Sequence, residues 1–195
     1  FPSSARWRAD ALRSLERHLR ANTFGSGLNR ELATEYHGLV LELGLAAVAE
    51  ADAAGVPVPA TVRLVLLRMT DALAAVVDNR LRPPRQGDAD DGHGLIVDGA
   101  GTDRWASLLA TGDAVFGRLA WWPEVTGGDV RTPLLAALIR PDAIEVTRPA
   151  SRPAHFADAG MTVLRGPEEI WCRCAGGPHG FLSIAAHAHA DALSL

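Results

Sequence analysis

The chain has 195 residues, a formal net charge of −4 and a hydrophobic content of 48%. This length and composition allow a sizeable core in one large or two small domains and argue against disorder. The 19 basic residues are all arginines and form no basic stripe, so we expect no nucleic-acid partner. Charged residues such as Glu42, Arg68 and Asp71 interrupt the longest apolar runs, so we expect no membrane span.

The two ends of the chain suggest a piece of a longer protein. The chain begins with Phe1 rather than Met, and it stops at Leu195 inside an alternating apolar and polar pattern. The heavy use of Ala and Arg is typical of a GC-rich, bacterial coding sequence. Cytoplasmic, periplasmic and secreted locations all stay open, as does the oligomeric state.

Residues 1 to about 140 predict helices. Apolar residues recur at helical spacing over residues 7–19, which indicates a first helix. A second helix is expected from Asn29 to about residue 53, where Gly55 and two prolines follow. The apolar spacing over residues 62–76 predicts a third helix.

A loop and shorter helices are expected next. Residues 82–94, RPPRQGDADDGHG, have the composition of a loop. Two short helices follow over residues 103–112 and 112–122, and the pair Thr132–Pro133 opens another helix that ends at Pro141. Helices joined in pairs by loops predict a helical-hairpin array without a strict repeat.

The last part of the chain predicts strands. Residues 161–165 and 169–174 have strand composition and flank a Gly-Pro turn. Residues 181–195 are expected to form a further extended segment. Because a linker rich in Pro and Ala precedes these strands, we predict a helical domain over residues 1–150 and the start of a β-domain over residues 151–195.

The extended segment at the end carries an H-x-H-x-D pattern. In a strand, His187, His189 and Asp191 would project from one face. Imidazole and carboxylate are ordinary zinc ligands, and burying three such groups without partners would be costly. The alternative is a half-exposed strand with three polar residues facing water. A metallo-β-lactamase type motif, H-x-H-x-D-H, fits less well because Ala192 replaces the final His.

Three segments resemble the heparinase II/III family of polysaccharide lyases. They are residues 28–47, LNRELATEYHGLVLELGLAA, residues 82–94, and residues 177–195, GPHGFLSIAAHAHADALSL. The resemblance implies a multidomain α and β fold. An incomplete (α/α) toroid of helix pairs would be followed by the first strands of an antiparallel β-sandwich, truncated at the C-terminus.

The resemblance implies cleavage of an acidic, uronate-containing polysaccharide by β-elimination. Such a reaction needs a group that neutralises the substrate carboxylate, a base at the α carbon and an acid at the leaving oxygen. Two rival hypotheses stay open: a non-catalytic carbohydrate-binding or scaffold protein of the same fold, and a metal-dependent hydrolase.

The helix predicted from Asn29 offers groups for this chemistry. Asn29 and Tyr36 are seven residues apart and would share a helical face, with Glu35 and His37 on either side of Tyr36. The family's helix has His after the Asn, whereas Arg30 stands here. Either His37 replaces that histidine or another group is the base. The structural alternative is Asn29 as a helix cap, Glu35 solvated, and Tyr36 and His37 in a packing seam.

The resemblance also implies roles outside this helix. His187 is expected to point toward the catalytic cleft, while His189 is the expected ligand of a structural zinc ion, with Asp191 as a second candidate. The remaining zinc ligands would come from strands beyond Leu195. Candidates for substrate contact are two residues of the acidic loop and one of the glycine-rich turn: Asp88, His93 and His179.

Overall fold

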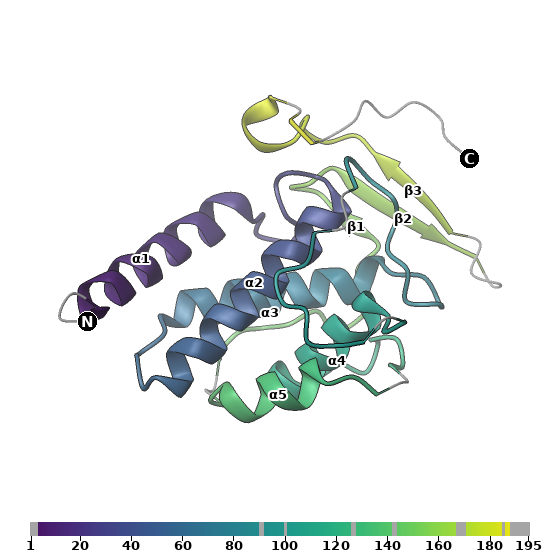
Figure 1. The fold of residues 1–195 in the computed structure, drawn as a ribbon. Helices are drawn as coiled ribbons and strands as arrows, with labels where there is room; N and C mark the ends of the chain where they lie inside the picture. Colours follow the sequence, from purple (N-terminus) through teal and green to yellow (C-terminus); the bar gives the residue numbers. More distant parts are fainter. Residues whose placement is uncertain are drawn as a thin grey trace.

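The computed structural model describes residues 4–89, 92–99, 101–125, 128–141, 144–166, 171–184 and 186–187. Within these residues the chain forms five α-helices, a three-stranded antiparallel sheet and a short 3-10 helix (Figure 1). The elements are α1 (Ser4–Asn22), α2 (Thr34–Ala53), α3 (Ala60–Val76), α4 (Arg104–Phe116), α5 (Arg131–Leu138), β1 (His155–Phe156), β2 (Met161–Arg165), β3 (Trp171–Ala175) and η1 (Phe181–Ser183).

The core lies between α2 and α3, which occupy the centre of the molecule, with α4 and α5 packed below them in Figure 1. Leu41 and Leu45 of α2 contribute to one cluster with Leu66 and Met69 of α3, and all four side chains are fully buried. The helices α1 and α3 cover the predicted stretches 7–19 and 62–76, which confirms both predictions.

The helix predicted from Asn29 begins five residues later, so that start was wrong. Leu32 adopts a left-handed backbone with φ of 52°, a conformation that interrupts a right-handed helix. The Asn29 side chain accepts a hydrogen bond from the backbone N–H of Glu31 at 2.9 Å and closes a turn there. Asn29 therefore lies before α2 and does not share a helical face with Tyr36.

The two short helices predicted over residues 103–112 and 112–122 are one helix, α4, which ends at Phe116. Asp103 caps its start by accepting hydrogen bonds from the N–H groups of Trp105 and Ala106. Gly112 lies inside the helix because α3 approaches closely there: a Cβ at this position would be 2.1 Å from the Thr70 Cγ2. The glycine thus marks a helix contact and not a break.

The sheet has the order β1-β2-β3 and pairs β2 with β3 along their full length, with Val163 opposite Arg173. The strand β1 lies within residues 148–160, RPASRPAHFADAG, the stretch rich in Pro and Ala that was expected to be a linker. Phe156 and Met161 of the sheet share a second hydrophobic cluster with Ala75 and Val76 of α3. The sheet therefore packs directly on the helices.

Two arginines, one just before the sheet and one at the end of β2, form hydrogen bonds with the C-terminal end of α3. Arg152 donates to the carbonyl oxygens of Ala75 and Val77, and Arg165 donates to the same two oxygens. These carbonyls lie in the last turn of the helix and beyond it, where backbone oxygens lack helical partners and basic side chains are favourable.

The extended segment predicted over residues 181–195 is not a strand where the structure describes it. Phe181–Ser183 form a 3-10 turn in which Leu182 has φ of 55°. His189 and Asp191 lie outside the described residues. The described chain is therefore a mixed α and β fold with helices before the sheet, and no helix in it is long and apolar enough to cross a membrane.

We expect Gly112→Ala to lower the free energy of unfolding by about 1–3 kcal/mol, because the added methyl group overpacks the contact with Thr70. An unobstructed helix would instead gain about 1 kcal/mol from this substitution. Urea denaturation measures the difference.

The matched control is the double variant Gly112→Ala with Thr70→Ser. It removes the Cγ2 methyl and keeps the hydroxyl that donates to the Leu66 carbonyl at 2.8 Å. Most of the lost stability should return. A single variant as stable as the parent would contradict the close packing of α3 and α4.

Candidate active site

Tyr36, His187 and Asp88 meet at the N-terminal end of α2. The Tyr36 and His187 rings stack with centroids 4.1 Å apart and an interplanar angle of 21°. The His187 Nδ1 lies 3.2 Å from the Asp88 Oδ2, and both side chains are partly exposed. Three residues predicted from separate segments of the sequence therefore lie together, with His187 in contact with both Tyr36 and Asp88.

The loop before Asp88 is held against α2 by backbone contacts. The Thr34 N–H donates to the Gln86 carbonyl at 2.9 Å, and the Asp88 N–H donates to the His187 carbonyl at 2.8 Å. Gly87 has φ of 66°, and a Cβ there would be 2.5 Å from the His187 oxygen. Only glycine fits this close approach without strain, so the glycine of the acidic loop helps to bring Asp88 to His187.

Asn29 and His37 form a separate, buried pair. The Asn29 N–H donates to the His37 Nδ1 at 3.3 Å, and the His37 Nε2 lies 3.1 Å from the Met69 carbonyl. These contacts fix the neutral tautomer with its proton on Nε2. Burial lowers the pKa of His37 from 6.5 to about 4, although the hydrogen bond to Met69 opposes this shift. Both ring nitrogens are thus engaged within the protein.

Glu35 is part of a charged network that the sequence analysis did not identify. The Arg104 Nη1 lies 2.7 Å from the Glu35 Oε2, and the Arg104 Nη2 lies 3.5 Å from the Glu42 Oε2. The Arg131 Nη2 lies 2.7 Å from the Glu42 Oε1, and the Gly94 N–H donates to the other oxygen at 2.7 Å. The available signal was an acidic residue inside the apolar run of α2, which requires partners when buried.

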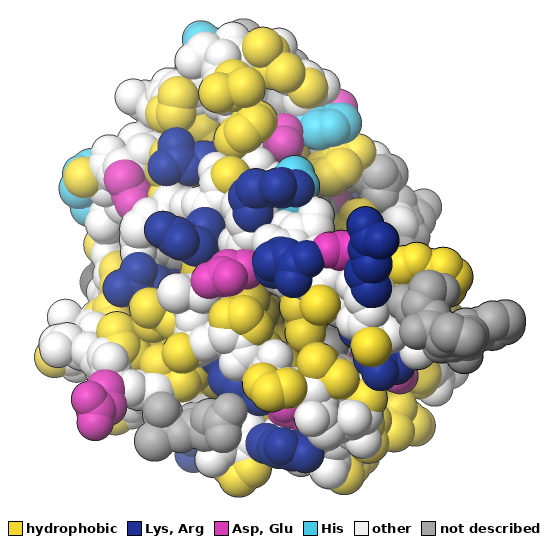
Figure 2. All heavy atoms as spheres, turned by 90° about the vertical axis from the view of Figure 1, so that its left-hand side faces the viewer, with side chains coloured by type: hydrophobic (Ala, Val, Ile, Leu, Met, Phe, Trp, Pro, Cys, Tyr) yellow, Lys and Arg dark blue, Asp and Glu magenta, His cyan; other side chains and the backbone are white. Residues whose placement is uncertain are grey.

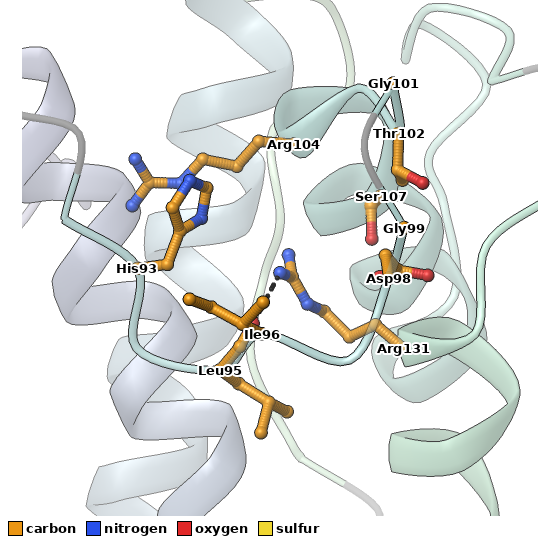
Figure 3. Close-up of a pocket in the computed structure, with 10 residues that line it drawn as sticks. All are labelled: His93, Leu95, Ile96, Asp98, Gly99, Gly101, Thr102, Arg104, Ser107 and Arg131. Atoms are coloured by element: carbon orange, nitrogen blue, oxygen red, sulfur yellow. Dashed lines mark hydrogen bonds between the residues drawn. The ribbon is translucent and has the colours of Figure 1, made fainter.

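The network borders a cavity of about 290 Å³ between residues 93–99 and 101–102 on one side and helices α4 and α5 on the other (Figure 3). Arg104, Ser107 and Arg131 form part of its lining, together with Asp98. His93 stands at its exposed edge, with Nδ1 3.9 Å from the Glu42 Oε1. His93 therefore belongs to this cavity, while Asp88 of the same loop belongs to the Tyr36 site.

The other predicted residues stand apart or lie outside the described chain. His179 is exposed in the turn after β3. Among the described residues, no three His, Cys, Asp or Glu side chains are grouped to hold a metal ion. His189 and Asp191, which the resemblance implies as zinc ligands, are outside the described residues.

The face that carries α1 is rich in arginine. Figure 2 shows Arg side chains gathered across the middle of this face, with acidic side chains between them. Arg13, Arg17 and Arg20 of α1 are all exposed. The same helix carries Asp10 and Glu16, so the face has mixed charge with arginine in excess.

No family model matches the chain, and neither a curated protein nor a solved structure matches it.

Titration of His37 predicts a loss of stability in acid. Its folded-state pKa of about 4 lies below the unfolded value of about 6.5. The contribution of neutral His37 to the free energy of unfolding is therefore complete above pH 6.5. It falls as the pH drops toward 4, by about 3 kcal/mol in total. In His37→Gln this part of the pH dependence should disappear, as measured by urea denaturation from pH 8 to pH 4.

His18→Gln is the matched control, because His18 is exposed on α1. This variant should keep the acid-dependent loss of the parent. Equal flattening in both variants would contradict the buried, neutral state of His37.

Proposed function

We propose that the protein is a polysaccharide lyase that cleaves an acidic, uronate-containing polysaccharide by β-elimination. The observation that carries the proposal is the contact of Tyr36, His187 and Asp88, which the resemblance to heparinase II/III lyases had singled out in three separate segments. The toroid and sandwich architecture of that family is part of the same proposal.

The reaction breaks a bond beside the uronate ring. A base removes the proton from the carbon next to the carboxylate, a double bond forms, and the bond to the leaving sugar oxygen breaks while an acid protonates that oxygen. We assign these proton transfers to the Tyr36 phenol and the His187 imidazole, which lie in stacked contact. The exposed arginines of α1 favour approach of the polyanion.

Asp88 has the role of positioning His187. Its carboxylate faces Nδ1 at 3.2 Å, and we assign Nε2 to the substrate. A carboxylate that holds one nitrogen fixes the tautomer and the orientation of the ring. Asn29 and His37 support this site from behind, because their mutual hydrogen bond and the contact with Met69 hold the first turns of α2.

Zinc belongs to the proposal as a structural ion and takes no part in these steps. We place its ligands at His189 and Asp191, as the resemblance implies, with others from elsewhere in the protein. Elemental analysis of the full-length protein should find zinc lost in His189→Ala and retained in His187→Ala. Loss in both variants would make His187 a ligand as well.

Tyr36→Phe and His187→Ala should each lower the rate of β-elimination about 10²- to 10⁴-fold, because each removes a proton-transfer group. The readout is the ultraviolet absorbance of the unsaturated product, measured on a panel of uronate-containing polysaccharides. Binding of the polysaccharide should change much less than the rate.

His18→Ala serves as the control, since His18 is an exposed histidine of α1, and it should retain the rate of the parent. Binding without any unsaturated product across the panel would favour a carbohydrate-binding protein. A saturated product that disappears with a chelator would favour a metal-dependent hydrolase.

A further inference from the structure

The cavity beside Glu42 has a buried floor and an exposed edge. Ser107 and Arg131 are 2% and 4% exposed at the floor, whereas Ile96 is 78% exposed. Figure 3 shows the Arg131 and Ser107 side chains directed toward the interior of the ring of labelled residues. The cavity of about 290 Å³ is close to the lower end of the range typical of ligand pockets, about 300–1,000 Å³.

Several buried polar atoms in this lining have no hydrogen-bond partner among the described residues. They include three donors, namely the Arg131 Nε and Nη1 and the Ser107 Oγ, and one acceptor, the Asp98 Oδ2. The other oxygen of Asp98 accepts from the Val130 N–H at 2.5 Å. Buried polar groups are almost always satisfied in folded proteins, so these atoms call for a ligand or water that both donates and accepts.

The charges around the cavity do not favour an anion. Its two guanidinium groups, on Arg104 and Arg131, already contact Glu35 and Glu42. Asp98 adds a third carboxylate. An added anion would meet more negative than positive charge, whereas a neutral group avoids this repulsion.

We propose that this cavity is a binding site for a neutral hexose ring. Sugar hydroxyls both donate and accept, so one ring can donate to Asp98 and accept from Ser107 and Arg131. The exposed Ile96 at the edge offers an apolar surface to the C–H face of the ring. The site is separate from the Tyr36, His187 and Asp88 contact, and binding there does not depend on lyase activity.

The competing occupant is water. Each water molecule takes about 30 Å³, so several would fit and could satisfy the same atoms. A bound hexose replaces them with hydroxyls held in one ring, which keeps the hydrogen bonds and reduces the number of molecules that must be ordered.

The test is to titrate the protein with the methyl hexosides of glucose, galactose and mannose. Binding is monitored by the shifts of the amide resonances of residues 93–107. At least one should bind with a dissociation constant in the millimolar range. Glucuronate should bind about tenfold more weakly, and sulfate should not bind. Preference for glucuronate or sulfate would overturn the proposal, and so would no response to all three hexosides, which would leave a cavity that holds water.

Two conservative variants localise the binding. Ser107→Ala should weaken hexoside binding about 3- to 10-fold, and Asp98→Asn about tenfold. The Ser107 hydroxyl has no partner among the described residues, and the Asn oxygen can still accept from Val130, so both variants should fold. Thermal unfolding checks this expectation.

The matched controls are Ser14→Ala in α1 and Asp113→Asn near the end of α4, both outside the lining. They should leave hexoside binding unchanged. Equal weakening in the controls would overturn the location of the site. If the parent protein catalyses β-elimination but binds none of the hexosides, this site is rejected and the lyase proposal stands.

Discussion

The buried carboxylate of Glu42 joins parts of the chain that lie far apart in the sequence. It is 1% exposed in the middle of α2, and removal of one partner from such a buried ion pair costs about 3–5 kcal/mol. Its partners come from α4, from α5 and from the loop at Gly94. One carboxylate therefore sets the places of two helices and of the loop that encloses the cavity.

The same network connects the two candidate sites. Arg104 reaches from Glu42 to Glu35, and Glu35 directly precedes Tyr36 in α2. Arg131 extends from Glu42 into the lining of the cavity. A rigid α2 thus presents Tyr36 at one end of the network, while its middle supports the polar floor of the proposed hexose site. Sites held on rigid elements keep their geometry better than sites on free loops.

Periodicity predicted the helices well where apolar residues alone decide the structure, as in α1 and α3. It failed where a single residue acts through tertiary contact. Leu32, with its left-handed backbone, delays the start of α2, and Gly112 packs on Thr70 although glycine often ends a helix. Neither effect leaves a signal in the residue pattern.

The candidate site could also be predicted only in part, because tertiary contacts decide the rest. Motifs identified Tyr36, Asp88 and His187, but their contact depends on the backbone of Gly87 and on the loop that crosses α2. Neighbours in a helix point about 100° apart, so His37 turns into the core while Tyr36 reaches His187. The network of Glu42, Arg104 and Arg131 joins residues distant in sequence, and spacing alone could not reveal it.

β-Elimination is tested most sharply by running the reaction in water labelled with heavy oxygen and analysing the products by mass spectrometry. β-Elimination by Tyr36 and His187 adds no water across the broken bond. We therefore predict that each cleavage leaves one fragment with an unsaturated, unlabelled uronate end, lighter by one water molecule than the same fragment from hydrolysis, while the leaving sugar keeps the original glycosidic oxygen. Incorporation of the label into a saturated uronate fragment would show hydrolysis instead.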